Sequence, residues 1–209
     1  MIIAHHLIWT AYGWWLPNDP RGSMSHCIRN DLIAELGALH YGRKRVQPAS
    51  RDIHAFYEKA KEKLQHPLLG FGPRETQAIG ECFAEVIRAA PYTCYACAIM
   101  PDHVHVLFRK HRDRAEMMIA NLQEATRLRL REGRLRDPDH PVWGGPGWWV
   151  FLDHPDEVRR TIRYIQGNPA KQGLAAQDWP FVKEYDNWPL HRGHSLDSPY
   201  ARRRHGEPF

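Results

Sequence analysis

The stretch Met100-Pro-Asp-His-Val-His-Val-Leu-Phe108 decides both the fold and the candidate site, because it is a short apolar run with two histidines two residues apart. Side chains of a β-strand alternate between its two faces. His103 and His105 therefore share one face of the predicted strand, while the two valines and Phe108 share the other. An imidazole pair opposite an apolar face can hold a metal ion. Taken alone, the pair is equally well explained as two solvated or hydrogen-bonded histidines.

The segment 155–169 predicts a helix with an apolar face and a polar face. Acidic residues suit its first turn, and Pro169 predicts an end near Asn168. The apolar stripe consists of Val158, Ile162 and Ile165. At about 3.6 residues per turn, Tyr164 and Asn168 lie about 40° apart, and Arg160 lies at a similar angle on the other side of Tyr164. A phenol, an amide and a guanidinium on one face suit a phosphate, although a helical tyrosine more often packs at the edge of a core.

Together, the run from Pro101 to Phe108 and the segment Tyr164-Ile-x-x-Asn-Pro-x-Lys171 resemble the single-tyrosine transposases of the HUH endonuclease superfamily. The resemblance is closest to the REP-associated tyrosine transposases within the insertion-sequence 200-like family. Two further stretches, Trp9 to Gly22 and Gln177 to Pro189, resemble segments of one subgroup. The resemblance covers most of the chain outside residues 23–70 and the C-terminal tail.

The resemblance implies a set of site residues and an activity. It implies that His103 and His105 are paired metal ligands, that Asn168 is the third ligand, and that Tyr164 is the nucleophile. The implied cofactor is a divalent cation, Mg²⁺ or Mn²⁺. The implied activity is site-specific nicking and strand transfer of single-stranded DNA at hairpins, through a 5′-phosphotyrosine intermediate. Members of the family act as monomers or as homodimers that exchange the tyrosine helix, so a homodimer is possible here.

Several cations and aromatic side chains are candidate nucleic-acid contacts. Arg160, Arg163 and Lys171 are close to Tyr164 in the sequence and could favour its ionised form or bind phosphate. Arg127 lies on the later turns of the preceding long helix. The tryptophans that could stack on unpaired bases are Trp14, Trp15, Trp148 and Trp149, although core positions explain each of them better. The basic clusters at 43–45 and 202–205 could contact phosphate or simply lie in solvent.

The order of the expected elements predicts a single α+β domain. Strands are expected at 2–10, 92–100, 103–108 and 148–152, and helices at 74–90, 114–132 and 155–168. The order βαββαβ is the ferredoxin-like pattern with an antiparallel sheet, here followed by an added helix that carries the tyrosine. Residues 17–70 form a long insertion after the first strand, with helical character at 31–39 and 53–64. Residues 175–209 form a C-terminal extension and tail.

Length and charge agree with a cytoplasmic nucleic-acid enzyme. A chain of 209 residues can bury a core, and a net charge of +5 favours a polyanionic partner. The sequence has no apolar run of about eighteen residues and no signal-peptide pattern, so we expect no membrane association. Cys94 and Cys97 have an odd spacing that would send them to opposite faces of a strand, and we expect the four cysteines to be reduced.

The sequence also allows two other functions. A ferredoxin-like sheet with aromatic residues also serves RNA-recognition domains, so the chain could be a domesticated binding module without cleavage activity. A metal-dependent hydrolase built on the histidine pair would need an Asp or Glu cluster that the sequence lacks.

The other histidines are expected outside the site: His5-His6 and the pair His191 and His194 at strand edges and in loops. Asp102 either orients the imidazole of a neighbouring histidine or is a turn residue before the strand.

Overall fold

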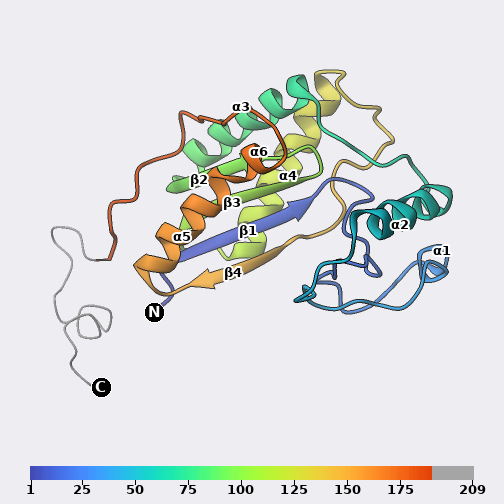
Figure 1. The fold of residues 1–209 in the computed structure, drawn as a ribbon. Helices are drawn as coiled ribbons and strands as arrows, with labels where there is room; N and C mark the ends of the chain where they lie inside the picture. The colour runs from blue at the N-terminus through green and yellow to red at the C-terminus, as the bar shows by residue number, and fades with distance from the viewer. Residues whose placement is uncertain (190–209) are drawn as a thin grey trace.

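Four strands form one antiparallel sheet in the computed structural model, which describes residues 1–189 (Figure 1). The strands are β1 (Ala4–Thr10), β2 (Cys94–Ile99), β3 (His103–Arg109) and β4 (Trp148–Leu152). Their order across the sheet is β2-β3-β1-β4, and every neighbouring pair is antiparallel. This order and these directions confirm the ferredoxin-like α+β fold.

Helices cover both faces of this sheet (Figure 1). They are α1 (Asp31–Ala34), α2 (Ser50–Lys63), α3 (Pro73–Ala89), α4 (Ala115–Glu132), α5 (Pro155–Gln166) and α6 (Asn168–Lys171). α3 and α4 pack together on one face, whereas α5 packs over β2 and β3 on the other. α1 and α2 belong to the insertion and lie beyond one end of the sheet. No described helix has the length and hydrophobicity that a membrane crossing needs. The histidines His191 and His194 and the basic cluster at 202–205 lie outside the described residues.

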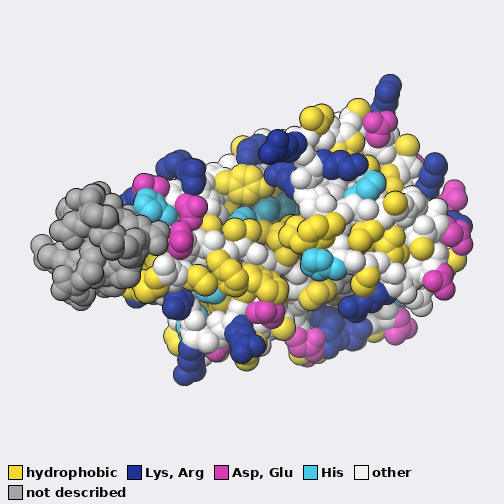
Figure 2. Space-filling model, turned by 90° about the horizontal axis from the view of Figure 1, so that it is seen from below, with side chains coloured by type: hydrophobic (Ala, Val, Ile, Leu, Met, Phe, Trp, Pro, Cys, Tyr) yellow, Lys and Arg dark blue, Asp and Glu magenta, His cyan; other side chains and the backbone are white. Residues whose placement is uncertain are grey.

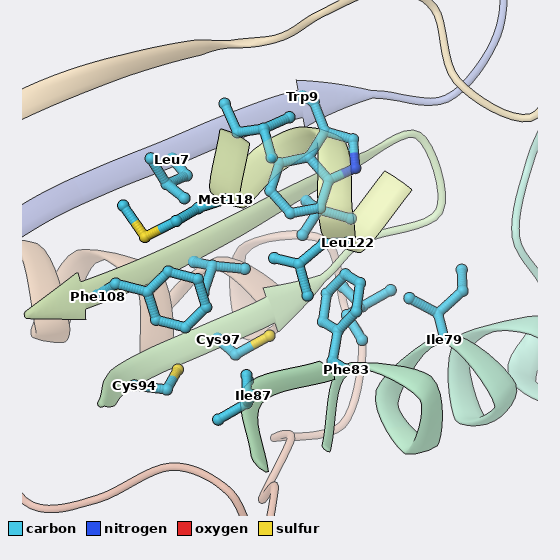
Figure 3. Close-up of a cluster of buried hydrophobic side chains, with 14 of the residues drawn as sticks. Leu7, Trp9, Ile79, Phe83, Ile87, Cys94, Cys97, Phe108, Met118 and Leu122 are labelled. Carbon is cyan, nitrogen blue, oxygen red and sulfur yellow. The ribbon is translucent and has the colours of Figure 1, made fainter. Parts of the chain in front are cut away.

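The larger core lies between the sheet and the pair α3 and α4 (Figure 3). The apolar face of β3 supplies Val104, Val106 and Phe108, all fully buried, as predicted from their alternation with the histidines. Phe83 from α3 and Leu122 from α4 pack against this face. A smaller cluster on the opposite face joins Leu107 to apolar residues of α5. The histidine face of the sheet is therefore covered only in part.

Cys94 and Cys97 face the same side of the sheet, which corrects the expectation that they point in opposite directions. The register shifts between Cys94 and Ala96, so that Tyr95 and Ala96 together occupy the space opposite Leu107. Such a β-bulge inserts one extra residue into the strand. Two residues at an odd spacing, such as Cys94 and Cys97, therefore face the same side of the sheet. Both thiols lie in the larger core, where burial raises their pKa above the usual value, and all four cysteines are free.

The tyrosine helix is interrupted where the sequence predicts one continuous helix. α5 ends at Gln166, and after Gly167 the short helix α6 begins at Asn168. Pro169 accounts for this break, because proline has no N–H to donate to the preceding turn and its ring crowds it. Tyr164 and Asn168 therefore sit on two successive helices rather than on one polar face.

Candidate active site

Three histidines from two neighbouring strands meet on the partly open face of the sheet. In the register of β1 on β3, Ile8 lies opposite His105 and Thr10 lies opposite His103. Residues directly opposite one another share a face, so His6 shares the face of both predicted ligands. His6 Nε2 lies 3.0 Å from His105 Nδ1. The ring centroids of His103 and His105 are 4.8 Å apart.

His6 is the site residue that the sequence analysis missed. The pair His5-His6 was expected at a strand edge, but β1 is a central strand, and only His5 points away from the site, against Phe151. The signal was present in the sequence, because His6 is an even number of residues from Ile8 and Thr10. To predict that His6 joins the site, one must know that β1 pairs with β3, and the periodicity within one strand does not reveal which strands pair.

Tyr164 and Asn168 lie in the same cavity as the histidines. The cavity has a volume of about 940 Å³ and its lining includes both residues together with His6, His103 and His105. The ring centroid of Tyr164 lies 5.5 Å from that of His105, and the tyrosine is 39% exposed, so a substrate can reach its hydroxyl. Asn168 is buried, and its Nδ2 has no hydrogen-bond partner within the described residues.

Each predicted ligand histidine has its Nδ1 engaged by another side chain. His103 Nδ1 lies 2.6 Å from Asp102 Oδ1. Burial opposes ionisation of Asp102, but the hydrogen bond from His103 keeps the pKa of this carboxyl below the usual value. Asp102 therefore accepts a hydrogen bond from Nδ1–H of His103 and leaves Nε2 of His103 free, which is how carboxylates orient metal-binding imidazoles.

His6 acts on His105 in the same way. Burial lowers the pKa of His6 to about 4 and holds that of His105 well below its usual value, so both rings are neutral at pH 7. One ring must then donate to the other. When His105 donates from Nδ1 and His6 accepts at Nε2, the Nε2 lone pair of His105 is free for a metal.

The residues present fit a divalent cation. Both histidines have their Nδ1 occupied and can offer Nε2. No group of three His, Cys, Asp or Glu side chains with metal-binding geometry occurs among residues 1–189, so a third protein ligand has to be of another type. The side-chain amide of Asn168 can be this ligand. The oxygen and nitrogen of an amide can be exchanged by rotating the group by half a turn. This rotation puts the oxygen at the buried position where Nδ2 has no hydrogen-bond partner within the described residues.

Of the four predicted cations, only Lys171 lines the cavity. Its Nζ lies 4.7 Å from the ring centroid of Tyr164. Arg160 lies outside the cavity and approaches Glu157 at 3.8 Å, and Arg163 is exposed on α5 without lining it. Arg127 is on α4, across the sheet from the site, and pairs with Glu124. The structure therefore brings Lys171, but not Arg127, to the tyrosine.

The four candidate tryptophans divide into two pairs. Trp14 and Trp149 pack against the larger core, as the commoner interpretation of tryptophan predicts. Trp15 and Trp148 line the cavity. Trp15 lies beneath the guanidinium of Arg21, at 3.8 Å from its carbon to the ring centroid. Trp148 is therefore the half-buried tryptophan best able to meet a ligand on the sheet.

No protein-family model matches the chain, and no curated protein matches it. Among solved structures, the chain is similar to a REP-associated tyrosine transposase bound to a REP hairpin, with 14% identity over 85% of this chain and 74% of that one and a TM-score of 0.45. It is also similar to a candidate transposase from Deinococcus radiodurans R1, with 12% identity over 84% of this chain and 94% of that one and a TM-score of 0.38. Both are described as transposases. At these identities, the function has to be inferred from the side chains of the site.

The neutral state of His6 predicts that folding stability falls as the pH is lowered from about 6.5 to about 4. Unfolding returns the pKa of His6 from about 4 to 6.5, so within this window the unfolded chain binds a proton that the folded chain does not. The free energy of unfolding should therefore decrease by on the order of 3 kcal/mol across the window. Urea unfolding at a series of pH values measures this decrease.

The variant His6→Gln keeps a hydrogen-bond acceptor but cannot titrate, so it should reduce this pH dependence by the contribution of His6. His5 and His105, whose pKa values burial also lowers, should keep their own contributions. The matched control is His54→Gln, which removes an exposed histidine on α2 and should leave the dependence unchanged. A His6→Gln protein with the same pH dependence as the unmodified chain would show that His6 is not a buried, neutral group.

Proposed function

We propose that the chain is a metal-dependent single-stranded DNA endonuclease and strand transferase of the REP-associated tyrosine transposase type. One observation carries this proposal: an accessible tyrosine, two histidines with free Nε2 atoms and a buried asparagine line a single cavity. A binding module needs none of these groups in this arrangement. A simple hydrolytic nuclease would use water and would not need the tyrosine.

Tyr164 is the proposed nucleophile. Its hydroxyl oxygen attacks the scissile phosphorus, the bond from phosphorus to the 3′ oxygen breaks, and a 5′-phosphotyrosine forms. The phenol proton passes to solvent, and the departing 3′ oxygen takes up a proton. Because one phosphate ester replaces another, a different 3′-OH can reverse the step, and this reversal is strand transfer.

Lys171 is the proposed electrostatic partner of Tyr164. Its ammonium nitrogen lies over the ring of Tyr164, at 4.7 Å from the ring centroid. A cation at this distance stabilises negative charge that develops on the phenol oxygen or on the phosphate. Arg160 and Arg163 stay candidates for phosphate contacts outside the cavity.

The proposed cofactor is Mg²⁺ or Mn²⁺ on His103, His105 and Asn168. These residues would hold the ion where it would supply a positive charge to the scissile phosphate and to the leaving oxygen. An amide ligand and phosphate oxygens suit Mg²⁺, while two imidazoles favour Mn²⁺. Asp102 and His6 hold the two imidazoles so that both Nε2 atoms are available.

The substrate that we infer is single-stranded DNA with a hairpin, as the two sequence motifs imply. A denaturing gel should show a covalent protein–DNA adduct when the chain is mixed with hairpin DNA from the flanks of its own gene and Mn²⁺ or Mg²⁺. EDTA, Tyr164→Phe and His103→Ala should each abolish the adduct, because they remove the metal, the nucleophile and a ligand.

The matched control for the nucleophile is Tyr41→Phe, which removes the hydroxyl of an exposed tyrosine outside the cavity and should leave the adduct intact. Hairpin binding without any adduct would instead support a domesticated binding module. An adduct that persists in Tyr164→Phe would mean that another residue is the nucleophile.

Metal binding should also be visible without DNA. At a hundredfold excess over its Kd, a ligand that binds only the folded state contributes about 2.7 kcal/mol, and in a domain of this size that raises Tm by roughly 5–10 °C. Thermal unfolding with Mn²⁺ should show this rise in the unmodified chain and in His54→Ala, and EDTA should reverse it. His103→Ala should show no rise; an equal rise in that variant would place the metal elsewhere.

A further inference from the structure

The cavity at the tyrosine continues well beyond the residues that the proposed chemistry uses. α5 covers the histidine face over β2, β3 and the ends of β1 and β4 at Ala4 and Leu152, but leaves Ile8 and Thr10 of β1 and Trp148 and Val150 of β4 at the cavity. Figure 2 shows this part of the surface as a hollow with histidines in it, bordered by hydrophobic and basic side chains. Residues 22–30 of the insertion form one wall of the cavity, and residues 144–147 also line it.

The floor of this extension is apolar and aromatic. Ile8 lies opposite His105 on one side and opposite Trp148 on the other, so these three side chains form one row across the sheet. Val150 lies in the next row, opposite His6. With strands about 4.8 Å apart, Trp148 lies about 10 Å from the histidine pair. An aromatic ring at that separation can reach a base close to the scissile phosphate.

The charges around the cavity are all of one sign. No Asp or Glu lines it within residues 1–189, although the chain carries 24 acidic residues. Its cations are Lys171 beside the tyrosine and Arg29 and Arg43 on the insertion wall. Both arginines are exposed, and neither makes an ion pair in the part of the chain that the structure describes. An apolar floor with unpaired cations above it is complementary to unpaired nucleotides, which present bases and phosphates together.

A buried network holds the insertion wall in position. The Asp19 carboxylate accepts hydrogen bonds from Tyr57 on α2 and from the Arg21 guanidinium, which in turn lies over Trp15. Asn18 Nδ2 donates to the carbonyl of Ile33 at 2.5 Å, tying the loop after β1 to α1. The wall is therefore anchored on two helices of the insertion, as a binding element requires.

We propose that this cleft binds the unpaired DNA nucleotides that adjoin the scissile phosphate, with a base stacked on Trp148 and phosphates bound by Arg29 and Arg43. The inference rests on the proposed function for the location of the scissile phosphate. It makes the insertion a substrate-binding element, separate from the metal ligands and the nucleophile.

Fluorescence anisotropy in EDTA tests the cleft without any chemistry. The probes are a labelled blunt hairpin and the same hairpin with an unpaired flank. Trp148→Ala should weaken binding of the flanked hairpin about 5- to 100-fold, the loss expected for one base stacked on an aromatic ring. Arg29→Gln combined with Arg43→Gln should lower the slope of log affinity against log salt by about 1.4, as expected for two phosphate contacts to a single strand. Binding of the blunt hairpin should not change.

The control is Arg45→Gln, which removes the same charge from an exposed position of the insertion that does not line the cavity. Because both tested arginines are exposed, their double variant keeps the test valid even if Trp148→Ala does not fold. Flanked-hairpin binding that is unchanged in both variants, or lost equally in Arg45→Gln, would overturn the proposal. An absent covalent adduct together with these losses would reject the nuclease but keep the cleft.

Discussion

Seven residue pairs between β1 and β3 determine which side chains face the site. A slip of one residue in this pairing would exchange the two faces of a strand, and it would send imidazoles into the core and valines to the cavity. Burying Val104, Val106 and Phe108 beneath α3 and α4 opposes such a slip. The same pairing puts His6 beside His105, so hydrophobic burial on one face holds the histidine geometry on the other.

The second constraint is the break between α5 and α6. Apolar residues of α5 attach it to the sheet, and Pro169 ends it before Asn168. Both residues line the cavity, where Tyr164 is exposed and Asn168 is buried. An exposed phenol and a buried amide thus lie only four residues apart in the sequence, on either side of the interruption at Gly167.

Patterns within one element predicted much of the fold and part of the site. The alternation of side chains along a strand predicted the face that His103 and His105 share. The helical period predicted the apolar side of the tyrosine helix, and the order of the elements predicted the antiparallel sheet. What depends on contacts between distant segments was not predictable in this way. The place of His6 in the site depends on the pairing of β1 with β3, and the shared face of Cys94 and Cys97 depends on the β-bulge between them. The position of Arg29 at the cavity depends on the path of the insertion. Arg127 satisfied a charge pattern but lies across the sheet, because a helix period does not say which layer the helix joins.

The most direct test of the account is to identify the residue that carries the DNA. Trypsin cleaves after Arg163 and Lys171, so digestion of the covalent adduct isolates the peptide Tyr164–Lys171. Tandem mass spectrometry after nuclease treatment should find a nucleotide joined through its 5′ phosphate to Tyr164 in this peptide. A nucleotide on any other tyrosine, or a link through a 3′ phosphate, would contradict the mechanism.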